Sequence, residues 1–212
     1  MSRAVQLMRL LLIATLAIAY ALLAHFTNTT NGQATLGTVL ALAPVGCVIL
    51  SIAWHSDRRI IAFLMISAVC LLLGLAWNTL SRHYDWIYWA EHAGTQGFLF
   101  YFFGRTLQSG REPLCSQIAR LVHGALTPTL ERYTRQVTFA WTCFFGLMTT
   151  VSTLLFFVAP LASWSWFANF LTAPLIALMF LAEYAARRVL HPDMEHAHIL
   201  DAVRIFWKAP AG

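Results

Sequence analysis

Long stretches without any charged residue are the feature that most constrains this chain. Asp, Glu, Lys and Arg are absent from residues 10–56, 60–81 and 136–182. Two of these windows are about twice the roughly 20 residues that a helix needs to cross a bilayer. Polar or proline-containing turns interrupt both, at 28–32 in the first and at 160–165 in the last. The pattern predicts several membrane-spanning helices.

Composition supports a membrane protein without a soluble domain. The 212 residues are 59% hydrophobic and 11% charged, whereas soluble domains carry about 25% charged residues. We therefore predict a single integral membrane domain over residues 1–212. The net charge of +5 is better explained by membrane topology than by nucleic-acid binding, because no basic stripe lies on a predicted soluble surface.

The fold class that we predict is all-α, a polytopic membrane protein with six transmembrane helices. The first apolar stretch also resembles a signal peptide, but it is longer than the usual apolar region of one. We expect an uncleaved first span. The six predicted spans cover residues of about 6–26, 36–54, 60–80, 86–107, 136–158 and 164–186.

The positions of the basic residues predict an orientation. With six spans, only Arg82 among the 14 Lys and Arg residues lies on one side. Cytoplasmic segments carry the excess of Lys and Arg, so we expect a bacterial inner-membrane protein with cytoplasmic N- and C-termini, loop 108–135 and tail 187–212. The residues on that side are Arg3, Arg9, Arg58, Arg59, Arg105, Arg111, Arg120, Arg132, Arg135, Arg187, Arg188, Arg204 and Lys208.

Two cytoplasmic segments have the pattern of short amphipathic helices that lie in the membrane surface. After Pro113, apolar residues recur at helical spacing through Ala125, and we expect Gly124, Thr127 and Pro128 to end this helix. A similar stripe covers residues 200–208 of the tail. Basic amphipathic helices beside a membrane are typically interfacial, although packing against the ends of the helix bundle would give the same pattern.

One group of candidate site residues, the external polar patch, is predicted near the outer face. Polar groups at membrane depth are costly, so each of them needs a reason to be there. Neighbouring carboxylate and imidazole groups could transfer protons. A packing role, in which Glu91 pairs with Arg82 or His92, is the alternative. The patch consists of Asn78, Arg82, Glu91, His92, Gln96 and Asn169.

A second group, the cytoplasmic arginine group, surrounds loop 108–135. Guanidinium groups match phosphate with two parallel hydrogen bonds, so these arginines could hold an anionic headgroup or an acidic partner protein. A plain topology signal with ion pairs to nearby glutamates is the alternative. The group consists of Arg105, Arg111, Glu112, Arg132, Tyr133, Arg135 and Glu183.

Other chemistries find little support in the sequence. His196 and His198 in the tail are two residues apart, which points them in different directions on a helix, and no HExxH motif is present. The four cysteines form no CxxC pair. Nucleotide-binding, haem-binding and serine-hydrolase motifs are also missing from the sequence. We expect no metal and no cofactor, identify no catalytic residue, and lean against an enzyme.

The second half of the chain resembles an uncharacterised family of bacterial inner-membrane proteins. Genes for such proteins often lie beside those for fatty-acid-like synthases, acyltransferases and exporters of aryl-polyene (xanthomonadin-type) pigments. The resemblance implies a process and assigns no reaction. It is carried by Phe103-Gly104-Arg105-Thr106-Leu107, Gly110-Arg111-Glu112-Pro113-Leu114, Arg132-Tyr133-Thr134-Arg135 with Val137, Thr138 and Trp141, and residues 178–184 with Arg187-Arg188.

These observations lead to three functional hypotheses. The first is an accessory inner-membrane protein that scaffolds or handles a lipid-like product, an acyl or aryl-polyene chain. Its partners would be membrane lipids, an acyl carrier protein or other biosynthetic membrane proteins. The second is a small proton-coupled transporter or flippase subunit that uses Glu91 and His92. The third is a membrane-embedded enzyme of lipid transfer.

Overall fold

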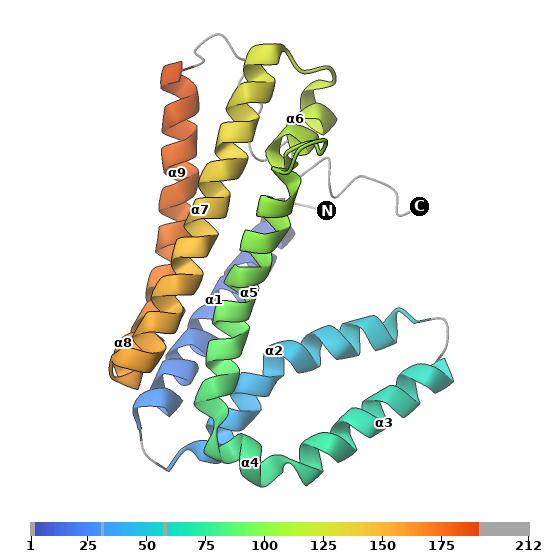
Figure 1. Cartoon of the computed structure of the whole chain (residues 1–212). Coiled ribbons are helices and arrows are strands. Elements are labelled where there is room, and N and C mark those ends of the chain that lie inside the picture. The colour runs from blue at the N-terminus through green and yellow to red at the C-terminus, as the bar shows by residue number, and fades with distance from the viewer. Residues whose placement is uncertain (1–2, 31, 57–58, 191–212) are drawn as a thin grey trace. The chain divides into compact units, whose positions relative to one another are not determined.

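The computed structural model describes residues 3–30, 32–56 and 59–190, and every element in these ranges is helical (Figure 1). The all-α fold class is therefore confirmed. The predicted tail helix and its histidines lie outside the described residues. The elements are α1 (Arg3–Thr29), α2 (Ala34–Trp54), α3 (Arg59–Leu75), α4 (Trp77–Arg82), α5 (Tyr84–Thr106), α6 (Leu114–His123), α7 (Pro128–Val158), α8 (Leu161–Trp166), a π-helical turn (Phe167–Leu171) and α9 (Thr172–Leu190).

The chain divides into two compact units. Unit 1 contains residues up to His92 together with Ser152–Ala173, and unit 2 contains Ala93–Val151 together with the residues from Pro174 onward. Helices α5, α7 and α9 contribute residues to both units. The prediction of a single membrane domain stays a prediction.

Four helical stretches in the described chain are long and apolar enough to cross a membrane: Val5–Thr29, Ala34–Trp54, Pro128–Val158 and Leu161–Val189. They correspond to the predicted first, second, fifth and sixth spans. Their apolar surfaces agree with this, because large side chains such as Leu11, Phe139 and Leu147 are more than half exposed and could contact lipid. These four helices indicate a membrane protein, as the charge-free windows predict.

The other two predicted spans are less clear-cut. The apolar helix Ile60–Leu75 falls short of the length of a span, since its 16 residues extend only about 24 Å at 1.5 Å per residue. A turn at Ala76 then separates α3 from α4. Helix α5 has 23 residues, which is long enough, but Asp85 and Arg105 lie in its first and last turns and Glu91 lies between them. Six crossings remain a prediction.

The end of α6 agrees with the sequence-based prediction at Gly124, whereas the start of α7 differs from it. Helix α6 ends at His123, and Gly124 follows with a φ of 75°, a left-handed conformation that glycine adopts at low cost. Pro128 does not serve to end this helix, because it begins α7. Proline is well suited to the first helical position, where the backbone N–H has no partner within the helix. Helix α7 thus starts eight residues before the predicted span at 136.

The core of unit 1 brings together residues from several helices. Ala24 of α1, Ala41 of α2, Tyr88 of α5 and Trp164 of α8 are all buried. Gly37 allows a close approach between α2 and Tyr84, because a Cβ atom at this position would lie 2.6 Å from the tyrosine ring. The Tyr84 hydroxyl donates a hydrogen bond to the carbonyl of Thr27 in α1 (2.7 Å). Tyr84 therefore links α5 to both α1 and α2.

We predict that Gly37→Ala destabilises the protein. The added methyl group must displace the ring of Tyr84 and disturb its bond to Thr27, at a cost of about 1–3 kcal/mol for overpacking. Gly46→Ala is the matched control on the same helix, because nothing lies within 4 Å of its Cβ position. Thermal unfolding in detergent should show a lower midpoint for Gly37→Ala alone. Equal midpoints for the two variants would contradict the close approach.

Candidate functional site

Hydroxyl groups from two neighbouring helices hold the beginning of α6 in place. The N-cap residue of α6 is Pro113, whose side chain accepts no hydrogen bond from the N–H groups of the first turn. Instead, the N–H of Leu114 donates to Thr106 Oγ1 of α5 (3.1 Å), and the N–H of Cys115 donates to Thr138 Oγ1 of α7 (3.1 Å). These bonds satisfy backbone donors that have no partner within the helix. They fix α6 against α5 and α7 within unit 2.

A third hydroxyl contact continues this attachment. Ser116 Oγ lies 2.6 Å from Thr134 Oγ1, and Thr134 donates its own hydrogen to the carbonyl of Leu130. Ser116 must therefore be the donor in the pair. Both residues are buried. Burial also raises the pKa of the Cys115 thiol, which leaves it protonated and a poor nucleophile.

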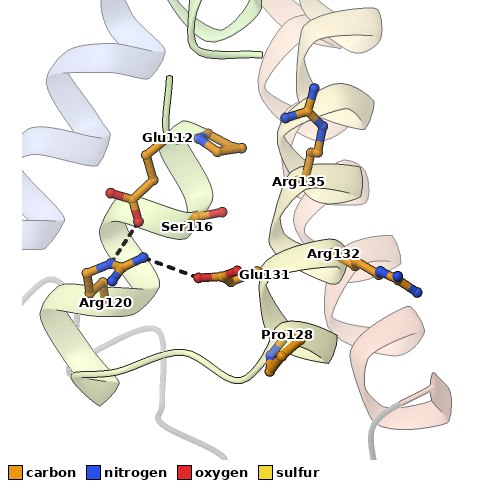
Figure 2. Close-up of a pocket in the computed structure, with 8 residues that line it drawn as sticks. Glu112, Ser116, Arg120, Pro128, Glu131, Arg132 and Arg135 are labelled. Atoms are coloured by element: carbon orange, nitrogen blue, oxygen red, sulfur yellow. Dashed lines mark hydrogen bonds and ion pairs between the residues drawn. The ribbon is translucent and has the colours of Figure 1, made fainter. Parts of the chain in front are cut away.

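A pocket of about 420 Å³ lies between α6 and the first turns of α7 (Figure 2). Its volume is in the range of small-molecule sites. Five of its eight lining residues carry a formal charge, so the pocket suits a polar group. The lining consists of Glu112, Pro113, Ser116, Arg120, Pro128, Glu131, Arg132 and Arg135.

The charged side chains of this pocket form two groups, one at each end. At one end, Arg120 Nε lies 2.8 Å from Glu112 Oε1, and Arg120 Nη2 lies 3.4 Å from Glu131 Oε1. Figure 2 shows Arg120 between the two carboxylates, while Arg132 and Arg135 extend from α7 away from this cluster. Arg120 and both glutamates are substantially exposed, so these ion pairs contribute little to stability.

Arg132 and Arg135 make no ion pair with any acidic residue in the part of the chain that the structure describes. Arg135 donates through Nη2 to the carbonyl of Leu107 (2.9 Å). This bond fixes the position of its guanidinium group at the end of α5 without neutralising its charge. Two positive charges without an acidic partner in the described ranges therefore border the pocket.

The structure separates the predicted cytoplasmic arginine group. Glu112, Arg132 and Arg135 line the pocket, and Arg120, which the sequence analysis counted only for topology, joins them. Arg105 lies over the ring of Phe102, with Cζ 5.2 Å from the ring centre. Arg111 is exposed and does not line the pocket. A clamp of four arginines around one ligand is therefore not formed.

Tyr133 and Glu183 belong to a different cluster, between α7 and α9. The Tyr133 hydroxyl donates to Glu183 Oε1 (3.0 Å), and Arg187 donates to both carboxylate oxygens of Glu183, at 3.1 and 2.7 Å. The Glu183 side chain is only 12% exposed. A partly buried carboxylate with this set of donors is well satisfied. The cluster joins α7 to α9.

Unit 1 contains a buried chain of hydrogen bonds that passes through His92. Trp164 Nε1 donates to Ser152 Oγ (3.1 Å), Ser152 Oγ lies 2.9 Å from His92 Nδ1, and His92 Nε2 lies 2.9 Å from Thr172 Oγ1. Thr172 in turn donates to the carbonyl of Phe167 (3.2 Å). The imidazole therefore forms hydrogen bonds through both ring nitrogens, which fixes the direction of the ring.

A second buried node lies at Ser165 in α8. Its hydroxyl oxygen is 3.1 Å from His25 Nδ1, 3.4 Å from Asn28 Nδ2 and 3.1 Å from Asn169 Nδ2. The two amide groups are donors, so the serine proton is available for His25. These contacts tie the end of α1 to α8 and to the π-helical turn. Such turns often occur at functional sites.

The predicted external polar patch is brought together only in part. His92 and Asn169 lie in these two networks of unit 1, whereas Asn78 and Arg82 are exposed and Gln96 belongs to unit 2. The ion pair of Glu91 with Arg82 or His92, one of the two sequence-based alternatives, is not formed among the described residues. Glu91 Oε1 is buried and accepts no hydrogen bond from any of them.

The sequence analysis missed the partners that make these networks. Ser152, Ser165 and Thr172 are small polar residues in apolar helices. A small hydroxyl group in a membrane helix is common and often bonds to its own backbone, so it gives no signal by itself. A more informative signal would have been the presence of several Ser and Thr residues in the helices that pack around one histidine, His92.

Metal binding finds no support in the described part of the chain, where no three His, Cys, Asp or Glu side chains come together. The tail residues His196 and His198 lie outside it. Comparison with protein-family models, curated proteins and solved structures finds no match to this chain.

Removing the central hydroxyl of the His92 chain should destabilise unit 1. Ser152→Ala leaves Trp164 Nε1 and His92 Nδ1 without their partner. Interhelical hydrogen bonds in membranes are worth about 0.6 kcal/mol each on average and up to about 1.7 kcal/mol, so we expect a loss of about 1–2 kcal/mol. Thr150→Ala is the control, because that exposed hydroxyl donates only within α7. Unfolding in denaturant should distinguish the two variants, and equal stability would rule out the buried chain.

Proposed function

We propose that this protein is an accessory component of a bacterial inner membrane that holds the phosphate-bearing headgroup of a lipid-like molecule. The observation that carries the proposal is the pocket between α6 and α7, bordered by Arg132 and Arg135, whose charges have no acidic partner among the described residues. Guanidinium groups are well suited to phosphate. The cavity is large enough for a headgroup and its first carbon atoms.

Helix α6 supports a site at a membrane surface. Its side chains Ile118 and Leu121 are 46% and 74% exposed, although the threonine contacts fix the start of the helix. An exposed apolar face on a short helix that also carries an arginine is typical of interfacial helices. A lipid whose headgroup enters the pocket would place its chains beside these residues.

The proposed topology has six crossings with both termini in the cytoplasm. The four long apolar helices support four of these crossings. Helix α5 would be a fifth, because it is long enough and its His92 side chain bonds to partners inside the protein. Segment 60–82 would be the sixth, with the α3–α4 break near one membrane surface. This arrangement puts the pocket on the cytoplasmic side, where substrates from soluble enzymes arrive.

The process is proposed from the sequence resemblance alone. Acyl or aryl-polyene chains made on an acyl carrier protein reach the membrane from the cytoplasm. Arg132 and Arg135 beside the pocket would also suit an acidic carrier protein. Handling of such a product requires binding without turnover.

We predict that the double variant Arg132→Gln/Arg135→Gln binds phospholipid more weakly. Each basic group near an anionic membrane contributes about 1 kcal/mol, or about fivefold in affinity. Arg111→Gln is the matched control, because this exposed arginine of the same loop does not line the pocket. Native mass spectrometry of protein with added phosphatidylglycerol measures the bound fraction. The proposal fails if the double variant and the control retain the same amount of lipid.

A second function, proton-coupled transport, is favoured by one observation. The buried Glu91 Oε1 has no hydrogen-bond partner among the described residues, and unpartnered ionisable groups at membrane depth are candidate functional groups. This function predicts that wild-type protein in vesicles dissipates an imposed pH gradient faster than Glu91→Gln, because an amide cannot titrate. Asp85→Asn on the same helix is the control. Equal rates for all three proteins would exclude this role of Glu91.

A further inference from the structure

We infer that the pocket between α6 and α7 recognises a headgroup that carries a primary amine next to its phosphate, as in phosphoethanolamine. The inference rests on the proposed function and specifies its ligand. Its basis is the charge at the end of the pocket opposite Arg132 and Arg135. There, two carboxylates, those of Glu112 and Glu131, share the single guanidinium group of Arg120. Within this group of three side chains, one negative charge is therefore in excess.

Glu131 is the carboxylate that remains available. Glu112 accepts from Arg120 Nε at 2.8 Å, whereas the contact of Arg120 Nη2 with Glu131 is 3.4 Å, beyond the usual length of a charge-assisted hydrogen bond. The Glu131 side chain is also the most exposed of the three, at 52%. An ammonium group could approach it without breaking the shorter pair.

The charged side chains of α7 point in different directions, so the phosphate and the amine of such a ligand would lie in different places. Glu131 and Arg132 are consecutive in α7 and extend to opposite sides in Figure 2. Arg135, four residues after Glu131, lies on the same face of α7 as Glu131, so a ligand along this face would place its phosphate beside Arg135 and its amine beside Glu131. A headgroup with a negative charge alone would leave Glu131 unpaired, and such an unpaired charge is a means of rejecting the wrong ligand.

The same chemistry occurs in a membrane lipid and in a soluble metabolite. Phosphatidylethanolamine and free O-phosphoethanolamine both present a phosphate and a primary amine two carbons apart. The exposed apolar side chains of Ile118 and Leu121 on α6 favour the lipid. A test must therefore compare the two sources under the same conditions.

The experiment measures lipid binding to the full-length protein in detergent by native mass spectrometry. Phosphatidylethanolamine and phosphatidylglycerol of equal chain length compete for the protein, with and without soluble O-phosphoethanolamine. The variants are Glu131→Gln, the double variant Arg132→Gln/Arg135→Gln, and Asp85→Asn as a control for loss of a carboxylate outside the pocket. Glu131→Gln changes an exposed side chain, so the variant should fold normally.

We expect wild-type protein and Asp85→Asn to prefer phosphatidylethanolamine by about two- to fivefold, the range of a partly exposed ion pair. Glu131→Gln should lose this preference and still bind both lipids. Competition by O-phosphoethanolamine would show that the headgroup is sufficient, and its absence would show that the acyl chains are required. Both results agree with the inference.

Two other outcomes count against these ideas and are distinguishable. Equal binding of both lipids by wild-type protein, unchanged in Glu131→Gln but weakened in the arginine double variant, would overturn the inference and leave the proposed function in place. Lipid binding that none of the pocket variants alters would overturn both.

Discussion

Lipid offers no hydrogen bonds, so every polar group that this chain carries into the apolar region must find its partner within the protein. At His92 and at Ser165 the structure meets this constraint with small hydroxyl side chains, whereas the buried Glu91 Oε1 has no partner among the described residues. Ser152 and Thr172 form hydrogen bonds with His92. The Ser165 hydroxyl forms them with the side chains of His25, Asn28 and Asn169. The imidazole of His92 is consequently fixed in direction. Its side chain links α5 to α7 and α9.

The same use of hydroxyl groups continues along α7 and determines where α6 lies. Thr138 donates to the carbonyl of Thr134 and accepts the N–H of Cys115. One side chain thus satisfies its own helix and the first turn of another. The pocket depends on this attachment, because Arg120 on α6 must lie within reach of Glu131 on α7 for the charges to be divided into two ends.

The sequence was sufficient for the parts of the structure that depend on apolar length. The charge-free windows predicted the four long helices, and the spacing from Leu114 predicted α6 to within two residues. The sequence could not show which charges meet, because residues far apart in the chain decide that. Arg120 was assigned to topology only, yet it joins Glu112 and Glu131, whereas Arg111 was expected in the site and does not line the pocket. The π-helical turn at Phe167–Leu171 also gave no sequence signal, because its stability depends on contacts with other helices.

The central claim is that the pocket lies on the cytoplasmic side of a six-span protein, and topology reporters test it most directly. Fusion points after Arg82 and after Gly110 lie beyond the two ends of α5. The account predicts a cytoplasmic signal from Gly110 and an external signal from Arg82, as well as from Gly32 and Pro160. If the fusions after Arg82 and Gly110 report the same side, α5 does not cross the membrane. An external signal from Gly110 would place the arginines of the pocket outside the cell, and the proposed role in receiving a cytoplasmic product would be wrong.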